Sequence, residues 1–391
     1  MITPTHNQSQ PTLFTDTDAR SDAIPGVFDP ARLTQARRLA AMTKTSLAEQ
    51  LHVSAVAIGQ WESGSHTPRP DHLNKLAELF EVPIAFFVAG RPFARLEGSE
   101  AHFRSLRRTP AKERERAVAF TEQVWELTHN LERHVQLPPV DLPGFSAGEV
   151  QTSAVSTDPV QAAQQLRREW GLGAGRIPKL VRLLERHGLI VTLTQFAGSA
   201  TATVDAFSTS HLPRPVIVLT PDRANDVYRH RFTAAHELGH LVLHHETAPG
   251  DKEQEREADV FAAEFLTPSA EIYPLLPTRM DLTALARLSA QWGVSVTSLI
   301  IRCREVGVIS EAAYRRAFQR HAQLTKLGLF SPQPVSEYPG EVPTMLNSAL
   351  ELAEKNGVTY RTLARDLRIS PARVLALLGR AEKRPVLHLI D

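Results

Sequence analysis

Hydrophobic positions in the first part of the chain recur at helical spacing and are broken by short turns. From 28 to about 90, apolar side chains repeat every three or four residues, which is typical of amphipathic helices. Ser54 has the residue type of a helix N-cap, and Gly64 ends the helix that follows it. The pattern predicts a unit of short helices over 28–90, preceded by a polar, disordered tail at 1–27.

Residues 91–157 are interpreted as a helical connector with a linker at its end. A charged helix is predicted from about 110 to 134, followed by a stretch rich in proline and then in serine and threonine. Arg104, Arg107 and Arg108 form a basic group before this helix. A solvated face is the preferred interpretation of that group over a contact with nucleic acid or a partner.

The period of the pattern changes between 158 and 330. Two helices are predicted at 158–171 and 177–187. Three short stretches then have the alternation or apolar character of strands, namely 189–196, 202–208 and 215–220. Helical spacing returns after them and continues to about 328. This order predicts a small antiparallel sheet that packs beside helices.

The end of the chain repeats a feature of its beginning. After a proline-rich linker at 331–343, the spacing of Leu47–Ser54 returns at Leu363–Ser370. The unit 344–391 is also locally basic, so a second helix-turn-helix and a plain helical cap are equal alternatives. The fold class predicted for the whole chain is mainly α with a small antiparallel β-sheet, an α+β arrangement.

Composition narrows the class of protein. A chain of 391 residues with 42% hydrophobic residues suffices for two or three domains with real cores. Its formal net charge of +1 gives no general polycation signature for nucleic acid, and its single cysteine, Cys303, excludes an internal disulfide framework. Because no secretory signal or membrane-length apolar run is present, we expect a cytoplasmic protein without a membrane partner.

Candidate chemistry lies in an apolar helical stretch at 232–245 that contains the pattern His-Glu-x-x-His. His236 and His240 are four residues apart, so both imidazoles leave the same helix face and can hold one Zn²⁺. Glu237 stands where a carboxylate can take a proton from a metal-activated water. The apolar neighbours predict a buried helix, and a metal would give all three polar side chains a partner. An ordinary amphipathic helix with surface histidines is the competing interpretation.

A third ligand is predicted in the next helical stretch. Glu255 and Asp259 share one face there, so Glu255 is assigned as the ligand and Asp259 as the acceptor that orients a ligand histidine. Glu257 is the alternative ligand, although it points to roughly the opposite side. The longer motif with a third histidine ligand is excluded because its glycine is absent. His244 and His245 are therefore expected to have solvated or structural roles.

Two runs, 231–244 and 255–268, resemble the ImmA/IrrE family of metallopeptidases. The resemblance is specific over about 150–270 and looser on either side. The chain has Asp259 where many relatives carry asparagine, and Leu-Thr-Pro where Leu-Met-Pro is usual. Neither departure affects the predicted metal ligands.

The resemblance implies a zincin-like metallopeptidase domain at 158–330. By this resemblance His236, His240 and Glu255 bind zinc and Glu237 is the general base. It also implies an intracellular protease that cuts a helix-turn-helix repressor and so releases genes for stress, DNA damage or mobile elements.

The stretch from Leu47 to Pro68 resembles the helix-turn-helix domains of the XRE class of repressors. Such a domain presents the outward residues of its second helix to the major groove of DNA. The candidate DNA contacts are Lys44, Ser54 and Gln60, of which Gln60 is the main side chain able to read a base. A protein-docking or sensing module that kept the fold is an equal alternative.

The function predicted from the sequence is that of a zinc-dependent endopeptidase acting on a partner repressor. Operator duplex or single-stranded DNA is a second expected partner, and homodimerisation is left open. Zinc is preferred over manganese because two histidines and one carboxylate suit it best. The alternatives are a DNA-binding transcriptional regulator whose peptidase fold is a sensor, and a general aminopeptidase or housekeeping protease.

Overall fold

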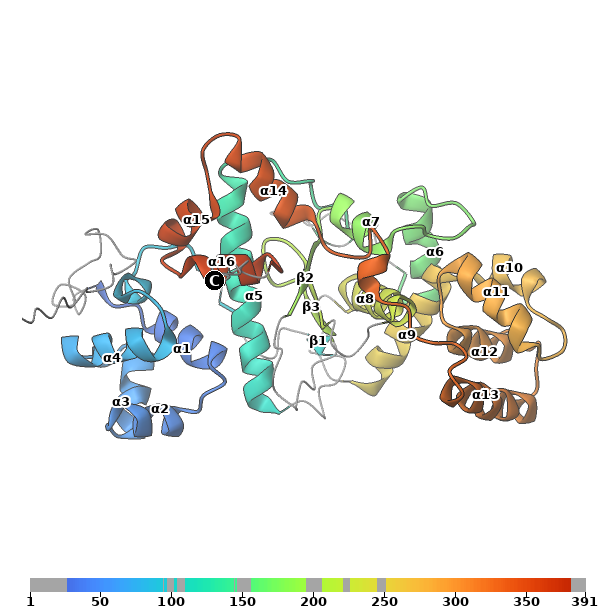
Figure 1. Ribbon diagram of the computed structural model, residues 1–391, viewed down its shortest axis with the longest axis horizontal. Coiled ribbons are helices and arrows are strands. Elements are labelled where there is room, and N and C mark those ends of the chain that lie inside the picture. Colours follow the sequence, from blue (N-terminus) through green and yellow to red (C-terminus); the bar gives the residue numbers. More distant parts are fainter. Residues whose placement is uncertain are drawn as a thin grey trace, which may run out of the picture.

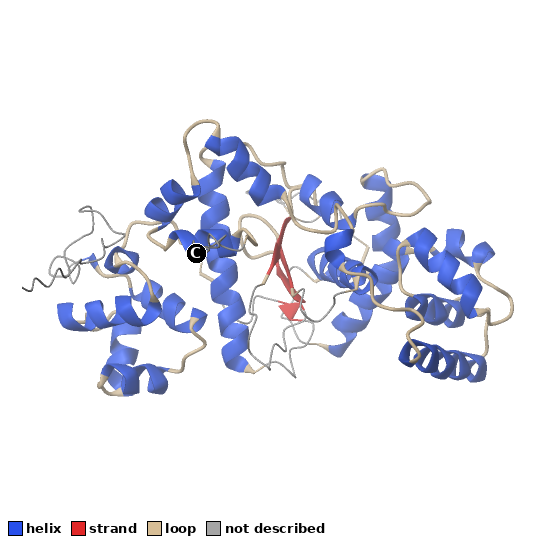
Figure 2. Cartoon of the chain, viewed as in Figure 1, coloured by secondary structure: helices blue, strands red, loops and turns tan. Residues whose placement is uncertain are grey.

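The computed structural model describes residues 27–93, 95–96, 102–103, 110–143, 145, 156–194, 206–220, 226–244 and 251–380. Residues 1–26 of the tail predicted at 1–27, the basic group of Arg104, Arg107 and Arg108, and His245 lie outside these residues. Helices dominate, and one small sheet lies near the middle of an elongated molecule (Figure 2). A mainly α fold with a small sheet is therefore confirmed.

The N-terminal unit consists of short helices around one apolar core (Figure 1). These are α1 (Pro30–Leu39), α2 (Lys44–Leu51), α3 (Ala55–Glu62), α4 (Pro70–Phe80) and the 3₁₀ helix η2 (Ile84–Phe87). Thr43 caps α2 through a capping box, and His52 ends it in the left-handed conformation, which turns the chain into α3. Leu33, Leu47 and Ile58 are fully buried between the helices.

Helix α5 (Ala111–Glu132) is a buried element, although its charged sequence suggests a surface helix. Every residue from Ala117 to Thr128 is buried. Its acidic side chains are used internally, because Glu126 accepts hydrogen bonds from Arg32 at 2.5 Å and from Gln35 at 2.9 Å. Helix α5 thereby joins the N-terminal unit to the rest of the molecule (Figure 1).

The sheet is mixed rather than purely antiparallel, which corrects the sequence prediction. Its strands are β1 (His102–Phe103), β2 (Ile190–Leu193), β3 (Ala206–Thr209) and β4 (Val216–Leu219), in the order β1-β3-β4-β2. Strand β3 is antiparallel to both β1 and β4, whereas β2 and β4 are parallel. The chain reverses direction between β2 and β3 and again between β3 and β4, so β4 runs in the direction of β2. Because β4 rather than β3 pairs with β2, this pair is parallel.

Both faces of this sheet are covered. Alternate side chains such as Phe207 and Val218 belong to the core shared with α5, whereas Ala206 and Ile217 belong to the core of the following helices. Those helices are α6 (Pro159–Glu169), α7 (Leu180–Arg186), α8 (Val227–Leu243), α9 (Lys252–Leu266), α10 (Ser269–Ile272), η5 (Tyr273–Leu275), α11 (Leu282–Trp292), α12 (Val296–Glu305) and α13 (Glu311–Lys326). Among the described residues no single helix has the length and apolar character to cross a membrane, although the bent pair α11–α12 meets both measures when joined.

The segment predicted as a linker at 331–343 is anchored to the helices beside the sheet. It contains the short 3₁₀ helix η6 (Val335–Glu337). Glu341 is 2% exposed, forms an ion pair with Arg231 of α8, and accepts hydrogen bonds from the backbone amides of Leu180 and Val181 at the start of α7. This proline-rich segment, which we call the strap (331–343), is therefore packed against the protein and is not a free spacer.

The C-terminal helices α14 (Met345–Glu354), α15 (Tyr360–Leu367) and α16 (Pro371–Leu377) pack on α5 (Figure 1). Three of their arginines are used inside the protein. Arg368 donates to the Val88 carbonyl at 2.8 Å, Arg373 to Gln123 at 2.7 Å, and Arg380 to Asn347. Arg368 ends α15 in the left-handed conformation and Ser370 caps α16, as His52 and Ser54 do between α2 and α3. The choice between a second helix-turn-helix and a helical cap remains a prediction, as do the domain boundaries.

Candidate metal centre

The local sequence explains why helix α8 is buried with polar side chains inside it. Asp226 caps the helix by accepting from the Tyr228 amide, and Ala234, Ala235, Leu238 and Leu241 pack into the surrounding core. The three motif residues are consequently enclosed, with His236 and His240 each 1% exposed and Glu237 fully buried. Side chains so placed need compensating partners, because a buried polar group without one is costly.

Helix α9 packs against α8 at Gly239. A Cβ atom at Gly239 would lie 3.1 Å from Cδ1 of Phe261 and 3.2 Å from Cα of Ala258. The glycine inside the motif therefore permits the approach that carries Glu255 to the two histidines.

The predicted ligand atoms converge on one point, which we call the metal centre (His236, His240 and Glu255). Their candidate ligand atoms all lie within 4.8 Å of one another. The two Nε2 atoms are 3.1 Å apart, and the Glu255 oxygens lie 3.6 Å from His236 Nε2 and 3.4 Å from His240 Nε2. Bonds of about 2 Å in a tetrahedral site separate ligand atoms by roughly 3.3 Å. The residues therefore fit a zinc-sized ion.

The electrostatics favour the protonation states that ligands require. Burial lowers the pKa of His240 to about 4, so its imidazole is neutral near pH 7. Burial acts to raise the pKa of Glu255, but hydrogen bonds to His236 and His240 outweigh it and lower the pKa to about 2. A neutral imidazole and an ionised carboxylate are the forms that bind metal.

Asp259 contacts one of the two predicted ligand histidines. Its Oδ1 lies 2.8 Å from His236 Nδ1. With the proton on Nδ1 donated to this carboxylate, the lone pair of His236 Nε2 faces the metal centre.

A second carboxylate reaches His240 through an additional histidine, and sequence reasoning missed this contact. His240 Nδ1 lies 3.0 Å from His244 Nδ1, and His244 Nε2 lies 2.9 Å from Glu257 Oε2. If His240 uses Nε2 toward the metal, its Nδ1–H donates to His244, which in turn donates its Nε2–H to Glu257. Glu257, the alternative ligand, thus lies outside the metal centre, and His244 has a structural role. The spacing of His244, four residues after His240, could have indicated this contact, as could that of Glu257, two residues after Glu255.

We expect His244→Phe to lower zinc affinity by roughly 10- to 100-fold, because His240 would lose the hydrogen-bond acceptor that fixes the orientation of its ring. Competition with a chromogenic chelator measures the change. His244→Asn keeps an acceptor and should retain more affinity, and His321→Phe on the distant helix α13 is the matched control. Unchanged affinity in His244→Phe would show that the contact has no orienting role.

Glu237 has a partner from the sheet. The Ser208 hydroxyl of β3 donates to Glu237 Oε2 at 2.8 Å. Ser208 is not among the site residues predicted from the sequence. Its signal is a hydroxyl residue within a short, fully buried strand, and the neighbouring Thr209 shares that signal.

Three residues before the motif are turned away from the metal centre. His230 Nε2 lies 2.9 Å from the Glu341 carbonyl, and Arg231 binds the Gly293 and Ile177 carbonyls. Tyr228 interacts with Tyr338. These side chains hold the strap at 331–343 in place.

The candidate DNA contacts in the N-terminal unit have different surroundings. Lys44 is about half exposed and pairs with Glu62 at 3.3 Å, while the Ser54 side chain caps α3 by accepting from the Ala57 amide at 3.1 Å. Gln60 is partly exposed on α3, near Val56, which is 69% exposed. The structure thus gives Ser54 a capping role and leaves the DNA contacts a prediction.

Comparison with known proteins identifies two parts of the chain. Residues 184–304 match a peptidase family model described as the IrrE N-terminal-like domain, and residues 33–87 match a helix-turn-helix model. The chain is also 36% identical over 69 residues to the HTH-type transcriptional activator BcrR of Enterococcus faecalis. That match covers 18% of this chain and 34% of the relative, so the chain spans about a third of the relative's length. The protein joins a metallopeptidase-like domain to an N-terminal helix-turn-helix domain.

Proposed function

We propose that this protein is a zinc-dependent endopeptidase that cuts a partner helix-turn-helix repressor and thereby switches on stress, DNA-damage or mobile-element genes. The observation that carries the proposal is the convergence of His236, His240 and Glu255 beside the buried carboxylate of Glu237. The match to a peptidase family model supports hydrolysis as the reaction class.

His236, His240 and Glu255 would hold the ion. Two imidazole nitrogens and one carboxylate oxygen favour zinc, and three protein ligands leave a coordination position open, as catalytic sites require. Zinc, when bound, supplies a Lewis acid that polarises the scissile carbonyl and increases the acidity of water.

Glu237 moves the proton. Its carboxylate takes a proton from the attacking water and returns it to the leaving amine. The hydroxyl of Ser208, which donates to Glu237 Oε2 at 2.8 Å, orients this carboxylate. Because Glu237 is fully buried, bulk water does not compete for it in the free protein.

A DNA-linked transcriptional regulator is the second candidate function. The helix-turn-helix domain and the partial match to a transcriptional activator favour it. In the proposed protease the same domain would bind operator DNA, dock the repressor or respond to single-stranded DNA.

The test combines metal content with cleavage. The purified full-length protein should contain about one zinc per chain and should cut helix-turn-helix repressors encoded near its gene at one discrete position, as mass spectrometry would show. Turnover of short unstructured peptides would instead favour a general peptidase. A protein that takes up no metal and cuts no repressor would contradict the proposal.

A further inference from the structure

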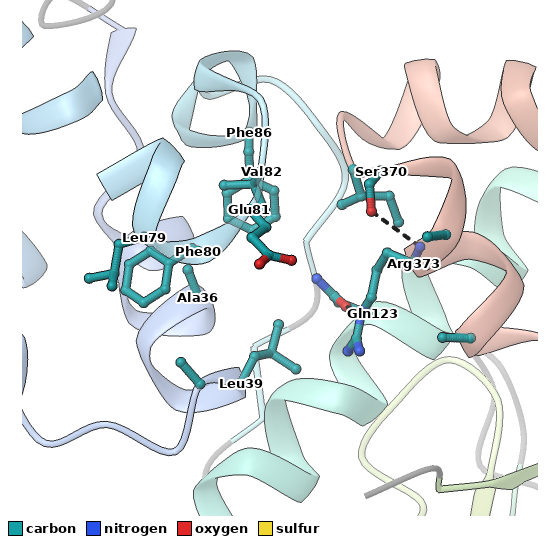
Figure 3. A pocket seen from close by; sticks show the side chains of 14 residues that line it. Ala36, Leu39, Leu79, Phe80, Glu81, Val82, Phe86, Gln123, Ser370 and Arg373 are labelled. Atoms are coloured by element: carbon teal, nitrogen blue, oxygen red, sulfur yellow. Dashed lines mark hydrogen bonds between the residues drawn. The ribbon is translucent and has the colours of Figure 1, made fainter. Parts of the chain in front are cut away.

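A cavity of about 410 Å³ lies where the N-terminal unit, α5 and the C-terminal helices meet (Figure 3). Its volume falls within the range of small-molecule sites. One wall is apolar and comes from α1, α4 and η2, with Leu39, Leu79, Phe80 and Phe86 among its side chains. The opposite wall comes from α5 and α16 and carries Gln123 and Arg373.

Arg373 is the cationic side chain that lines this cavity. Its Nε donates to Gln123 at 2.7 Å, whereas its Nη2 is buried and has no hydrogen-bond partner. The side chain as a whole is partly exposed. Burial, together with the nearby positive charge of Arg116, lowers the pKa of Arg373 to about 10, so the guanidinium is still charged near pH 7.

The positive charge of Arg373 is not balanced by a carboxylate within the part of the chain that the structure describes. No ion pair links it to an acidic residue, and Arg116, the charged group that acts on it, is also a cation. Glu81 lines the cavity but is an exposed residue and forms no ion pair with Arg373. The guanidinium is partly exposed and lies over the ring of Phe120, 5.6 Å from its centroid. It has no carboxylate partner among the described residues, so this wall is suited to receive an anion.

We propose that this cavity binds a small monocarboxylate with an apolar body. The carboxylate pairs with the guanidinium of Arg373, and the apolar body packs against the wall that contains Leu39 and Phe80. Glu81 disfavours a second negative charge on the ligand. The ligand would contact segments from both ends of the chain and so stabilise the placement of the helix-turn-helix domain on α5. This proposal does not depend on the metal centre.

The experiment titrates the full-length protein with 4-phenylbutanoate in a calorimeter. We expect saturable binding of one molecule per chain. 4-Phenylbutan-1-ol has the same body without the anion and acetate has the anion without the body, so both should bind at least about tenfold more weakly. Absence of saturable 4-phenylbutanoate binding, or equal binding of the alcohol, would overturn the proposal.

Two variants locate the binding site. Arg373→Met removes the cation and Ala376→Phe fills the cavity while leaving the cation in place. Each should weaken 4-phenylbutanoate binding at least about tenfold. Arg365→Met, at an arginine whose side chain is 73% exposed, is the matched control and should bind like wild type. If Arg373→Met does not fold, Ala376→Phe alone tests the location of the site. Wild-type affinity for 4-phenylbutanoate in either variant, once it is shown to be folded, would overturn the proposal.

Discussion

Replacing Glu237 by glutamine is expected to lower kcat for repressor cleavage by roughly 100- to 10,000-fold while leaving zinc content and fold unchanged. The amide is nearly isosteric with the carboxylate and can still accept from Ser208, which now lies 2.8 Å from Oε2. It cannot take a proton from water. Single-turnover cleavage, metal analysis and thermal melting of the same preparation measure the three quantities.

Glu253→Gln is the matched control, because Glu253 is an exposed carboxylate on α9 that pairs with Arg256 and not with the metal centre. Full activity in Glu237→Gln would remove Glu237 from the mechanism. A gene-expression phenotype that survives the loss of cleavage would instead favour the regulator with a sensing peptidase fold.

Replacing His236 by alanine is expected to remove zinc and, with it, all cleavage. The loss of affinity should exceed the roughly 10- to 100-fold effect of changing a residue that only orients a ligand. Asp259→Asn, which alters the 2.8 Å contact to His236 Nδ1, provides that comparison within the same centre. Elemental analysis after dialysis against a weak chelator measures retention, and one zinc per chain in His236→Ala would contradict the assignment.

Thermal melting with and without chelator shows whether His236→Ala acts through folding. The apolar contacts of α8, including those of Ala234 and Leu238, do not involve the imidazole. The variant should therefore melt cooperatively and resemble metal-free wild type. A variant that fails to fold would leave His240→Ala and Glu255→Gln to carry the same test.

The metal centre could be predicted because its elements have short-range signatures. Four-residue spacing puts His236 and His240 on one face of a helix, and the same spacing joins Glu255 to Asp259. One helix start was similarly readable, since Ser54, predicted as an N-cap, caps α3. These features depend on residues within one or two turns of each other.

The burial of α5 could not be read in the same way. Its sequence is charged, but Glu126 meets Arg32, which is 94 residues away along the chain. The burial of the strap likewise depends on a distant partner, since Glu341 forms an ion pair with Arg231, 110 residues away along the chain. A charged helix or a proline-rich segment is a surface feature only when no distant partner neutralises and covers it.

Local spacing in the chain is thus enough to predict the helices and the N-terminal helix-turn-helix. It also predicts that His236 shares a helix face with His240, and Glu255 with Asp259, because helix geometry alone places those pairs. Tertiary packing decides the rest. It brings Glu255 rather than Glu257 to the two histidines, gives His244 and Ser208 their partners, and makes β4 parallel to β2. Each of these depends on which segments pack together. Side chains from different segments come within hydrogen-bonding distance only after the core between those segments has formed.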